Sequence, residues 1–293
     1  MSDVLPAGDV ARSFGAASRS YDAAAVLQAE VREELLSRLS LLKTTPLAAL
    51  DLGCGTGAGA LAIKRQFRRA QVTAADLSPA MLDRARRHSR FWRRIRCVEA
   101  DARQLPFEPA SFDLVFTNLM LQWVQPLDAA LAQIRRVLRP GGLLLASSFG
   151  PLTLQELRAA WSAADDGVHV NDFVDMHDFG SALQRAGFAE PVLDVDRHLR
   201  HYPDATALMR SIKAIGAHNL HAARRRGLTG RGAYARMVEA YEAQRAERGL
   251  PATWQVVHAV AWAPDTRPAA AAVENEVRID ARQLRDQLAA RRR

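Results

Sequence analysis

The sequence predicts an α/β protein with an open sheet, helices on both faces and a helical cap inserted before the last strand. Three observations predict it. The apolar run 46–52 is followed by alternating glycines and a helical pattern, which is the order of a strand, a tight turn and a helix. Two further runs, 71–76 and 95–100, alternate with helical patterns and lead to acids. A long helical stretch, 202–251, separates two late strand patterns.

The glycine-rich stretch 50–57 reads Leu-Asp-Leu-Gly-Cys-Gly-Thr-Gly. Glycines at Gly53, Gly55 and Gly57 let the backbone turn sharply and approach a ligand that a Cβ would obstruct. Free amides at the start of the following helix favour a carboxylate or a phosphate. A glycine turn alone is also found in dinucleotide-binding domains or as a purely structural turn. Asp51, placed two residues before the first glycine, favours a more specific cofactor site.

Acids stand at the ends of the next two predicted strands. Asp76 follows the glycine loop by about 20 residues, the separation expected for an acid that accepts hydrogen bonds from ribose hydroxyls. As a helix cap before Ser78 it would look similar. Asp101 can accept a hydrogen bond from an adenine amino group. Leu77 and Ala102, beside these acids, are expected to line the same site.

The stretch 51–57, Asp-Leu-Gly-Cys-Gly-Thr-Gly, resembles motif I of the S-adenosylmethionine-dependent methyltransferases of the seven-stranded, Rossmann-like class. This resemblance implies S-adenosylmethionine as cofactor and S-adenosylhomocysteine as product. It also implies a class I methyltransferase sheet of seven strands. The cofactor-binding residues implied are Asp51, Gly53, Gly55, Gly57, Asp76, Leu77, Asp101, Ala102 and Asn118.

The fourth predicted strand, 111–117, precedes Asn118, Gln122 and Trp123. Ligands in open α/β sheets bind outside the carboxyl ends of strands, so Asn118 is expected where the methyl group is presented. Gln122 and Trp123 are expected to line the acceptor channel, or Trp123 packs the next helix. An Asp/Asn-Pro-Pro-aromatic motif is absent, which argues against an amine or base as methyl acceptor.

The remaining elements follow from periodicity and from stop signals. Residues 1–20 are polar and small and are expected to include a frayed start. Residues 22–42 are expected to form an amphipathic helix with Asp22 as its N-cap. Tyr21 either points into the site or packs against the sheet. Residues 139–142 are expected to stop a helix before strand 143–147, and strands 191–199 and 255–262 are expected to complete the sheet. The other expected helices are 58–67, 79–88, 127–138, 152–163, 176–186, 205–216 and 232–248.

These elements predict five regions along the chain. They are an N-terminal lid helix (1–45), a cofactor-binding core (46–201), a helical insertion on the acceptor side (202–251), the final strand (252–263) and a linker with a basic tail (264–293).

Composition narrows the class of protein. Two cysteines in 293 residues give neither a disulfide framework nor a metal spacing, and no apolar run reaches the roughly 20 residues of a membrane span. A cytoplasmic location is therefore expected. The net charge is +8, with arginines concentrated in 84–96 and basic residues in 197–231. Such clusters attract an anionic partner or are simply solvated helix faces.

A closer resemblance comes from stretches outside the cofactor motifs. Residues 13–22, 118–123, 208–219, 226–231 and 250–254 resemble the malonyl-acyl-carrier-protein O-methyltransferase family of biotin synthesis, and the likeness extends from about residue 10 to 264. Trp254 departs from the tyrosine expected there. The family transfers a methyl group to the free carboxylate of a malonyl thioester, whose methyl ester primes pimeloyl synthesis.

That reaction implies roles for particular residues. A carboxylate is ionised at neutral pH, so the reaction needs alignment and exclusion of water rather than a general base. Tyr21, Asn118 and Gln122 are expected to position the reactants, and Arg210 or Lys213 to hold the malonyl carboxylate or the phosphopantetheine. The partner is an acidic acyl carrier protein carrying malonyl-phosphopantetheine, or malonyl-coenzyme A. Its expected binding residues are Arg210, Lys213, Arg224, Arg225, Arg226 and Arg231.

Two other readings stay open. The protein could methylate another small carboxylate or RNA, although no RNA-binding module is visible, or it could be a non-catalytic assembly factor on the same fold. A metal site is not expected, because His218 and His221 lack further Cys or His ligands at a metal-binding spacing.

Overall fold

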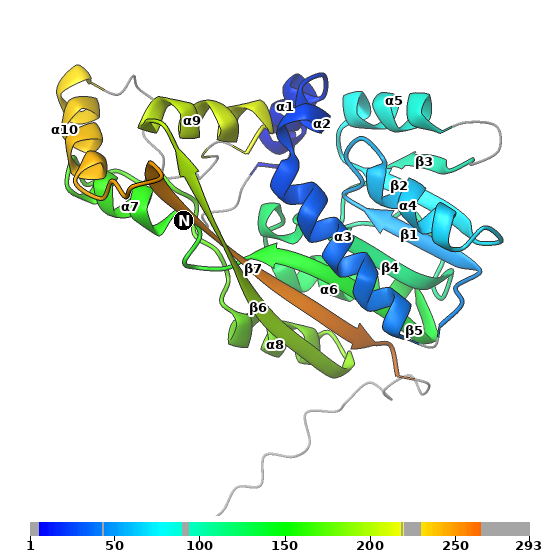
Figure 1. Ribbon diagram of the computed structural model, residues 1–293. Helices are drawn as coiled ribbons and strands as arrows, with labels where there is room; N and C mark the ends of the chain where they lie inside the picture. The colour runs from blue at the N-terminus through cyan, green and yellow to red at the C-terminus, as the bar shows by residue number, and fades with distance from the viewer. Residues whose placement is uncertain (1–5, 43, 90–93, 218, 220–229, 265–293) are drawn as a thin grey trace, which may run out of the picture.

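The computed structural model describes residues 6–42, 44–89, 94–217, 219 and 230–264. These residues form a seven-stranded sheet in the order β3-β2-β1-β4-β5-β7-β6, covered by helices on both faces (Figure 1). The expected open α/β sheet is confirmed. In the same part of the chain, no helix is long and apolar enough to span a bilayer.

Five strands of the sheet run parallel, and the strand order reverses at its centre. They are β1 (Ala48–Leu52), β2 (Gln71–Asp76), β3 (Arg96–Glu99), β4 (Phe112–Asn118) and β5 (Leu138–Phe149). Because β1 lies between β2 and β4, the chain leaves β1 to one side and later returns on the other. The gap above the carboxyl ends of β1 and β4 is therefore the switch point at which ligands bind in such sheets.

The sheet is completed by two antiparallel pairings. β7 (Leu250–Trp262) lies between β5 and β6 (Ala189–Tyr202), antiparallel to both. Both strands are longer than the patterns 255–262 and 191–199 predicted. Their extra residues reach beyond the sheet edge toward the inserted helices (Figure 1).

Helices cover the two faces with separate apolar clusters. On one face α3 (Val26–Leu41), α4 (Ala58–Gln66) and α5 (Pro79–His88) pack over β1 and β2. On the other face α6 (Leu127–Val137) and α8 (Met176–Arg185) bury their apolar stripes against the sheet. The two clusters lie on opposite faces of the sheet, and cavities remain at the carboxyl ends of the strands.

Residues 6–20 are mostly helical. They contain α1 (Ala7–Ala17), and α2 (Tyr21–Ala24) follows before α3. Phe14 of α1 meets Trp123 edge-to-face, with ring centroids 5.3 Å apart. No helix was expected in this segment, because the aromatic partner of Phe14 lies about a hundred residues away. The start of the chain, residues 1–5, lies outside the described residues. Asp22 is also not an N-cap, since Ser20 occupies that position.

The insertion between β6 and β7 contains α9 (Ala205–Ala214) and α10 (Arg231–Glu242). α10 packs against α7 (Gln155–Ser162), away from the strand ends (Figure 1). The end of α9 instead joins the N-terminal helices, because the Ser13 hydroxyl donates to the Gly216 carbonyl oxygen over 2.7 Å. The N-terminal helices and the insertion thus meet above the same sheet edge.

One expected turn belongs to a strand. Residues 139–142 were predicted as a helix stop but lie within β5. Gly141 has φ +72°, and its N–H donates to the Ala263 carbonyl oxygen. Pairing with the end of the β7 segment supplies hydrogen bonds that a free turn would lack. The predicted tail beyond residue 264 lies outside the described residues.

Candidate functional site

Two cavities meet above the carboxyl ends of β1 and β4. The larger has a volume of about 910 Å³ and lies between α2–α3 and the glycine loop. The smaller, about 100 Å³, lies between α1 and the ends of β2 and β3. Both are lined by Tyr21, Gly53, Gly55 and Asn118. The two cavities are therefore two halves of one site.

The glycines of the loop have different functions. Gly53 and Gly55 have φ of +72° and +52°, a left-handed region that favours glycine. A Cβ on Gly53 would clash with Met120, whereas one on Gly55 would meet only Tyr21, at 3.9 Å, and would enter the cavity. Gly57 lines neither cavity; its Cβ would lie 2.8 Å from that of Ala85. It serves the packing of α4 on α5 rather than ligand contact.

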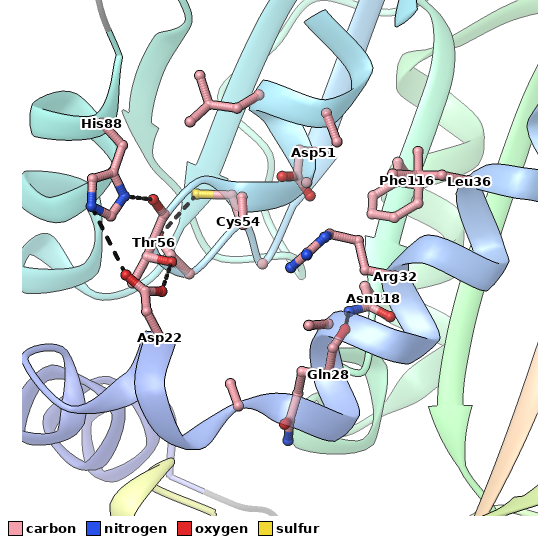
Figure 2. Close-up of a pocket in the computed structure, with 18 of the residues that line it drawn as sticks. Asp22, Gln28, Arg32, Leu36, Asp51, Cys54, Thr56, His88, Phe116 and Asn118 are labelled. Atoms are coloured by element: carbon pink, nitrogen blue, oxygen red, sulfur yellow. Dashed lines mark hydrogen bonds and ion pairs between the residues drawn. The ribbon is translucent and has the colours of Figure 1, made fainter. Parts of the chain in front are cut away.

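Asp51 is a buried acid with one free oxygen. Its carboxylate accepts from the Ala60 N–H at the start of α4, and its Oδ2 has no hydrogen-bond partner among the described residues. Burial raises the pKa of Asp51 to about 7. Arg32 of α3 lines the same cavity, and Figure 2 shows its side chain extending into the space between α3 and the loop. An acid and a base thus border one cavity.

Asp76 orders the glycine loop. Its two oxygens accept hydrogen bonds from the Gly55 and Ser78 N–H groups, each over 2.8 Å. Burial raises the pKa of Asp76, and these hydrogen bonds oppose the rise. The carboxylate also lines the smaller cavity, as the sequence predicted for a ribose-binding acid. Ser78 is the N-cap of α5, so Asp76 does not cap this helix, although it accepts from the Ser78 N–H.

Asp101 lines the smaller cavity together with Leu77 and Ala102. Its carboxylate is already paired, because Arg103 Nη2 lies 2.6 Å from Oδ2. The hydrogen bond from Arg103 holds the pKa of Asp101 below its usual range. Arg103 was not expected as a partner of Asp101, although a cation two residues after a strand-end acid is the signal that would have suggested it.

Asn118 connects α3 to the sheet. Its Nδ2 donates to the Gln28 carbonyl oxygen over 2.9 Å, and its Oδ1 accepts from the Ser147 hydroxyl over 2.9 Å. The side chain is thus held by protein groups on both sides. Gln122 lines neither cavity, and its amide nitrogen donates to the Leu119 carbonyl oxygen instead. The expected contact of Gln122 with the reactants has no support in this arrangement.

Tyr21 stands between the two cavities, so of its two predicted placements it takes the one within the site. Burial, Asp76 and Asp22 raise the pKa of Tyr21, which therefore stays a neutral hydroxyl. Next to it, the Thr56 hydroxyl donates to Asp22 Oδ1 over 2.6 Å. His88 Nδ1 lies 3.1 Å from the Thr56 carbonyl oxygen, as Figure 2 shows. The first contact fastens α2 to the glycine loop, and the second joins the end of α5 to it.

A helix face that the sequence analysis did not use completes the larger cavity. Tyr21, Ala25, Gln28, Arg32 and Leu36 all line it. They recur at spacings of three or four residues, which places them on one side of the α2–α3 segment. Once Tyr21 was chosen, this periodicity would have predicted Gln28 and Arg32 as site residues.

The expected malonyl-binding residues face outward. Arg210 and Lys213 of α9 and Arg231 of α10 are exposed, and none of them lines either cavity. The range 224–226, with its three arginines, lies outside the described residues. A contact of Arg210 or Lys213 with a carboxylate inside these cavities is therefore not what the structure presents.

One group of potential metal ligands lies away from the site. Glu34, Asp196 and His258 approach one another, with His258 Nε2 3.3 Å from Asp196 Oδ2. Arg38 shares the group, since its Nη2 lies 3.2 Å from Glu34 and 3.4 Å from Asp196. Because a cation already neutralises the carboxylates, the group is an ionic contact between α3 and the β6–β7 pair. His218 and His221 lie outside the described residues.

Comparison with known proteins connects this site with methyl transfer. Residues 50–146 match the family model described as a methyltransferase domain. The chain is 47% identical over 268 residues to the malonyl-acyl-carrier-protein O-methyltransferase of Laribacter hongkongensis, covering 88% of this chain and 90% of that protein. It is 46% identical over 266 residues to the protein of the same name from Methylovorus, covering 89% and 90%.

Solved structures share the fold at much lower identity. The YcgJ protein of Bacillus subtilis matches with a TM-score of 0.58 and 16% identity, covering 80% of this chain and 99% of that protein. A protein of Bacillus halodurans C-125, described as a methyltransferase, matches with a TM-score of 0.55 and 17% identity, covering 80% and 98%. At such identities the likeness concerns the fold alone.

Proposed function

The chain belongs to the malonyl-acyl-carrier-protein O-methyltransferase family, and from this premise we propose how its residues perform the reaction. The protein is an S-adenosylmethionine-dependent O-methyltransferase that acts on the free carboxylate of a malonyl thioester. The observation that carries the residue assignments is the two-part cavity joined at Tyr21, Gly53, Gly55 and Asn118. We assign the methyl ester to pimeloyl synthesis in the biotin pathway, and the enzyme to the cytoplasm.

The residues present fit S-adenosylmethionine. The larger cavity offers the free Oδ2 of Asp51 and the cation of Arg32, which suit the ammonium and the carboxylate of an amino acid. The smaller cavity offers Asp76 for the ribose and the Asp101–Ala102 segment for the adenine. Gly55 leaves open the space that a Cβ would fill between the two halves. We propose that these groups hold the cofactor.

When bound, S-adenosylmethionine would supply a methyl group on a positively charged sulfur. The malonyl carboxylate would displace that sulfur at the methyl carbon, with S-adenosylhomocysteine as the leaving group. The protein supplies no base, because the acceptor is already an anion. The raised pKa of Tyr21 keeps its hydroxyl protonated, so it can donate a hydrogen bond but not abstract a proton. We propose that it orients the acceptor beside the glycine loop.

The N-terminal helices exclude water from the reaction. The Asn118 amide holds α3 through the Gln28 carbonyl, and Thr56 holds α2 through Asp22. Phe14 closes the outer side by packing on Trp123. Asn118 therefore acts as a positioning residue through the lid rather than by touching the reactants. Such closure both aligns the acceptor and shields it from solvent.

The carrier is proposed to dock outside this closed site. An acyl carrier protein is acidic, and Arg210, Lys213 and Arg231 are exposed on the inserted helices. Their role is then to attract the carrier rather than to bind the malonyl carboxylate. Malonyl-coenzyme A, whose phosphates are also anionic, is the second acceptor to compare.

The test is a methyl-transfer assay with label in the methyl group of S-adenosylmethionine. Malonyl-acyl carrier protein, malonyl-coenzyme A and bulk RNA are offered in parallel, with Asp76→Ala as the inactive control. We expect base-labile label, as in a methyl ester, in a malonyl thioester and none in RNA. Label in RNA alone, or tight cofactor binding with no transfer to any acceptor, would overturn the proposal.

A further inference from the structure

A third cavity lies beside the site, on the other side of α3. Its volume is about 200 Å³. The first turn of α3 forms one wall through Leu27 and Gln28, and α9 forms another through Ser211. Arg200 of β6 and Trp254 of β7 form its floor. Gln28 also lines the larger half of the site, so this one residue separates the two spaces.

Two side chains of this floor carry N–H groups without partners. Arg200 Nε and Trp254 Nε1 are closed off from solvent and have no acceptor among the described residues. Trp254 pairs with His198 in the antiparallel register and Ala252 with Arg200, so both side chains project from the same face of the sheet. Buried donors in folded proteins nearly always have an acceptor. Because both side chains line this cavity, a ligand that carries acceptor oxygens could supply the missing partners.

The cavity has an outer and an inner end. The Arg200 side chain is 29% exposed and forms an ion pair with Glu30, while Trp254 is only 5% exposed. Gln28, at the boundary with the cofactor half, is 8% exposed. In space, the order Arg200, Trp254, Gln28 therefore leads from the surface toward the cofactor half of the site.

We propose that this cavity is the subsite for the malonyl thioester and the start of its carrier arm. The donor at Trp254 binds the thioester carbonyl oxygen, and the malonyl carboxylate reaches past Gln28. The cation at Arg200 binds the arm nearer its anionic phosphate. The apolar wall of Leu27 and α9 accommodates the short aliphatic part. This proposal rests on the proposed function, since it assigns the acceptor half of the same reaction.

The first test compares two variants at position 254 that differ by one hydroxyl. Trp254→Phe removes the donor. Trp254→Tyr replaces the indole N–H by a hydroxyl donor, and its ring has the same size as that of Phe. We expect Trp254→Phe to lower kcat/KM for a malonyl thioester about fivefold relative to Trp254→Tyr, with S-adenosylmethionine affinity equal in both. Equal kcat/KM in the two variants would overturn the assignment of a donor at this position.

The second test fills the cavity and separates its ends. We expect Ser211→Phe to lower kcat/KM for malonyl-acyl carrier protein about tenfold or more without changing cofactor affinity. Val192→Trp, an exposed position on β6, is the matched control and should leave both unchanged. Arg200→Gln should lower kcat/KM for malonyl-acyl carrier protein. It should not lower kcat/KM for a malonyl thioester of N-acetylcysteamine, because the short arm of that substrate carries no phosphate. Equal loss on both substrates would contradict the proposed direction of the arm.

The outcomes distinguish the two proposals. If the unmodified protein methylates no malonyl thioester, the proposed function fails. If the unmodified protein methylates a malonyl thioester and Ser211→Phe retains the same kcat/KM as Val192→Trp, the proposed reaction stands and only the proposed role of the third cavity fails.

Discussion

The cofactor side and the acceptor side of this site are built in different ways. On the cofactor side, Asp51, Gly53 and Gly55 are close in sequence, and Asp76 reaches the loop through a single strand pairing. On the acceptor side, Arg200 pairs with Glu30 and Ser13 bonds to Gly216, contacts between residues 170 and 203 positions apart. The first can be recognised from local sequence, whereas the second requires the fold. The variants below perturb one side at a time.

The largest effect is expected at Gly53, on the cofactor side. Gly53→Ala places a side chain at φ +72°, which costs about 1–2 kcal/mol, and drives it into Met120. We expect loss of measurable S-adenosylmethionine binding by calorimetry, with a lowered Tm. Gly230→Ala is the control, because Gly230 has φ −63° and no atom lies near its would-be Cβ. Similar binding by both variants would refute the close approach of this loop to the cofactor.

The next effect concerns the ionic contact between α3 and the β6–β7 pair, outside the site, and its stability in acid. Burial and Arg38 lower the pKa of His258 to about 4, so the folded protein binds fewer protons than the unfolded chain between pH 6.5 and 4. Stability should therefore fall as the pH drops through this window, by up to about 3 kcal/mol from this residue. Urea unfolding at pH 7 and pH 4.5 measures it.

His258→Leu provides the comparison for this stability measurement. It should flatten the difference between the two pH values while leaving cofactor affinity at pH 7 unchanged. An equally steep loss of stability in His258→Leu would assign the acid sensitivity to other groups.

A smaller effect of pH is expected on the cofactor side. Since the pKa of Asp51 is about 7, only part of the population has the ionised carboxylate at neutral pH in the free enzyme. A cofactor ammonium prefers that ionised form, so S-adenosylmethionine affinity should rise severalfold, up to about tenfold, between pH 6 and pH 8. Asp51→Asn should bind more weakly and lose this dependence. An unchanged slope in the variant would remove Asp51 from the site.

The smallest effect tests how the two sides are joined. Thr56→Val removes the hydroxyl that donates to Asp22, a change of about 1 kcal/mol. We expect faster amide hydrogen exchange in α1 and α2, with a severalfold rise in KM for the acceptor. Ser37→Ala, which removes an exposed hydroxyl on α3, is the control. Unchanged exchange in α1 and α2 would show that this contact does not hold the lid.

The same contrast explains what the sequence predicted. The strand-end acids and the glycine spacing predicted residues that line the two cavities, because backbone direction alone decides where such residues lie. The helix α1 was not expected, since its contacts, such as that of Phe14 with Trp123, are to distant parts of the chain. Arg210 or Lys213 was expected to hold the malonyl carboxylate or the phosphopantetheine. Their positions on the helix turn Ser211 and Ile212 to the interior and the two cations to solvent. The clustering of basic residues indicated that cations lie on this helix, but it did not indicate which way their side chains point.

The most direct measurement compares the two sides in one experiment. S-adenosylmethionine Kd and kcat/KM for malonyl-acyl carrier protein are determined for Gly53→Ala and Ser211→Phe. The account predicts that Gly53→Ala loses cofactor binding, while Ser211→Phe keeps an unchanged Kd and loses kcat/KM for the acceptor. An unchanged Kd in Gly53→Ala, or a Kd in Ser211→Phe that rises together with the loss of activity, would contradict the division of the site into these two halves.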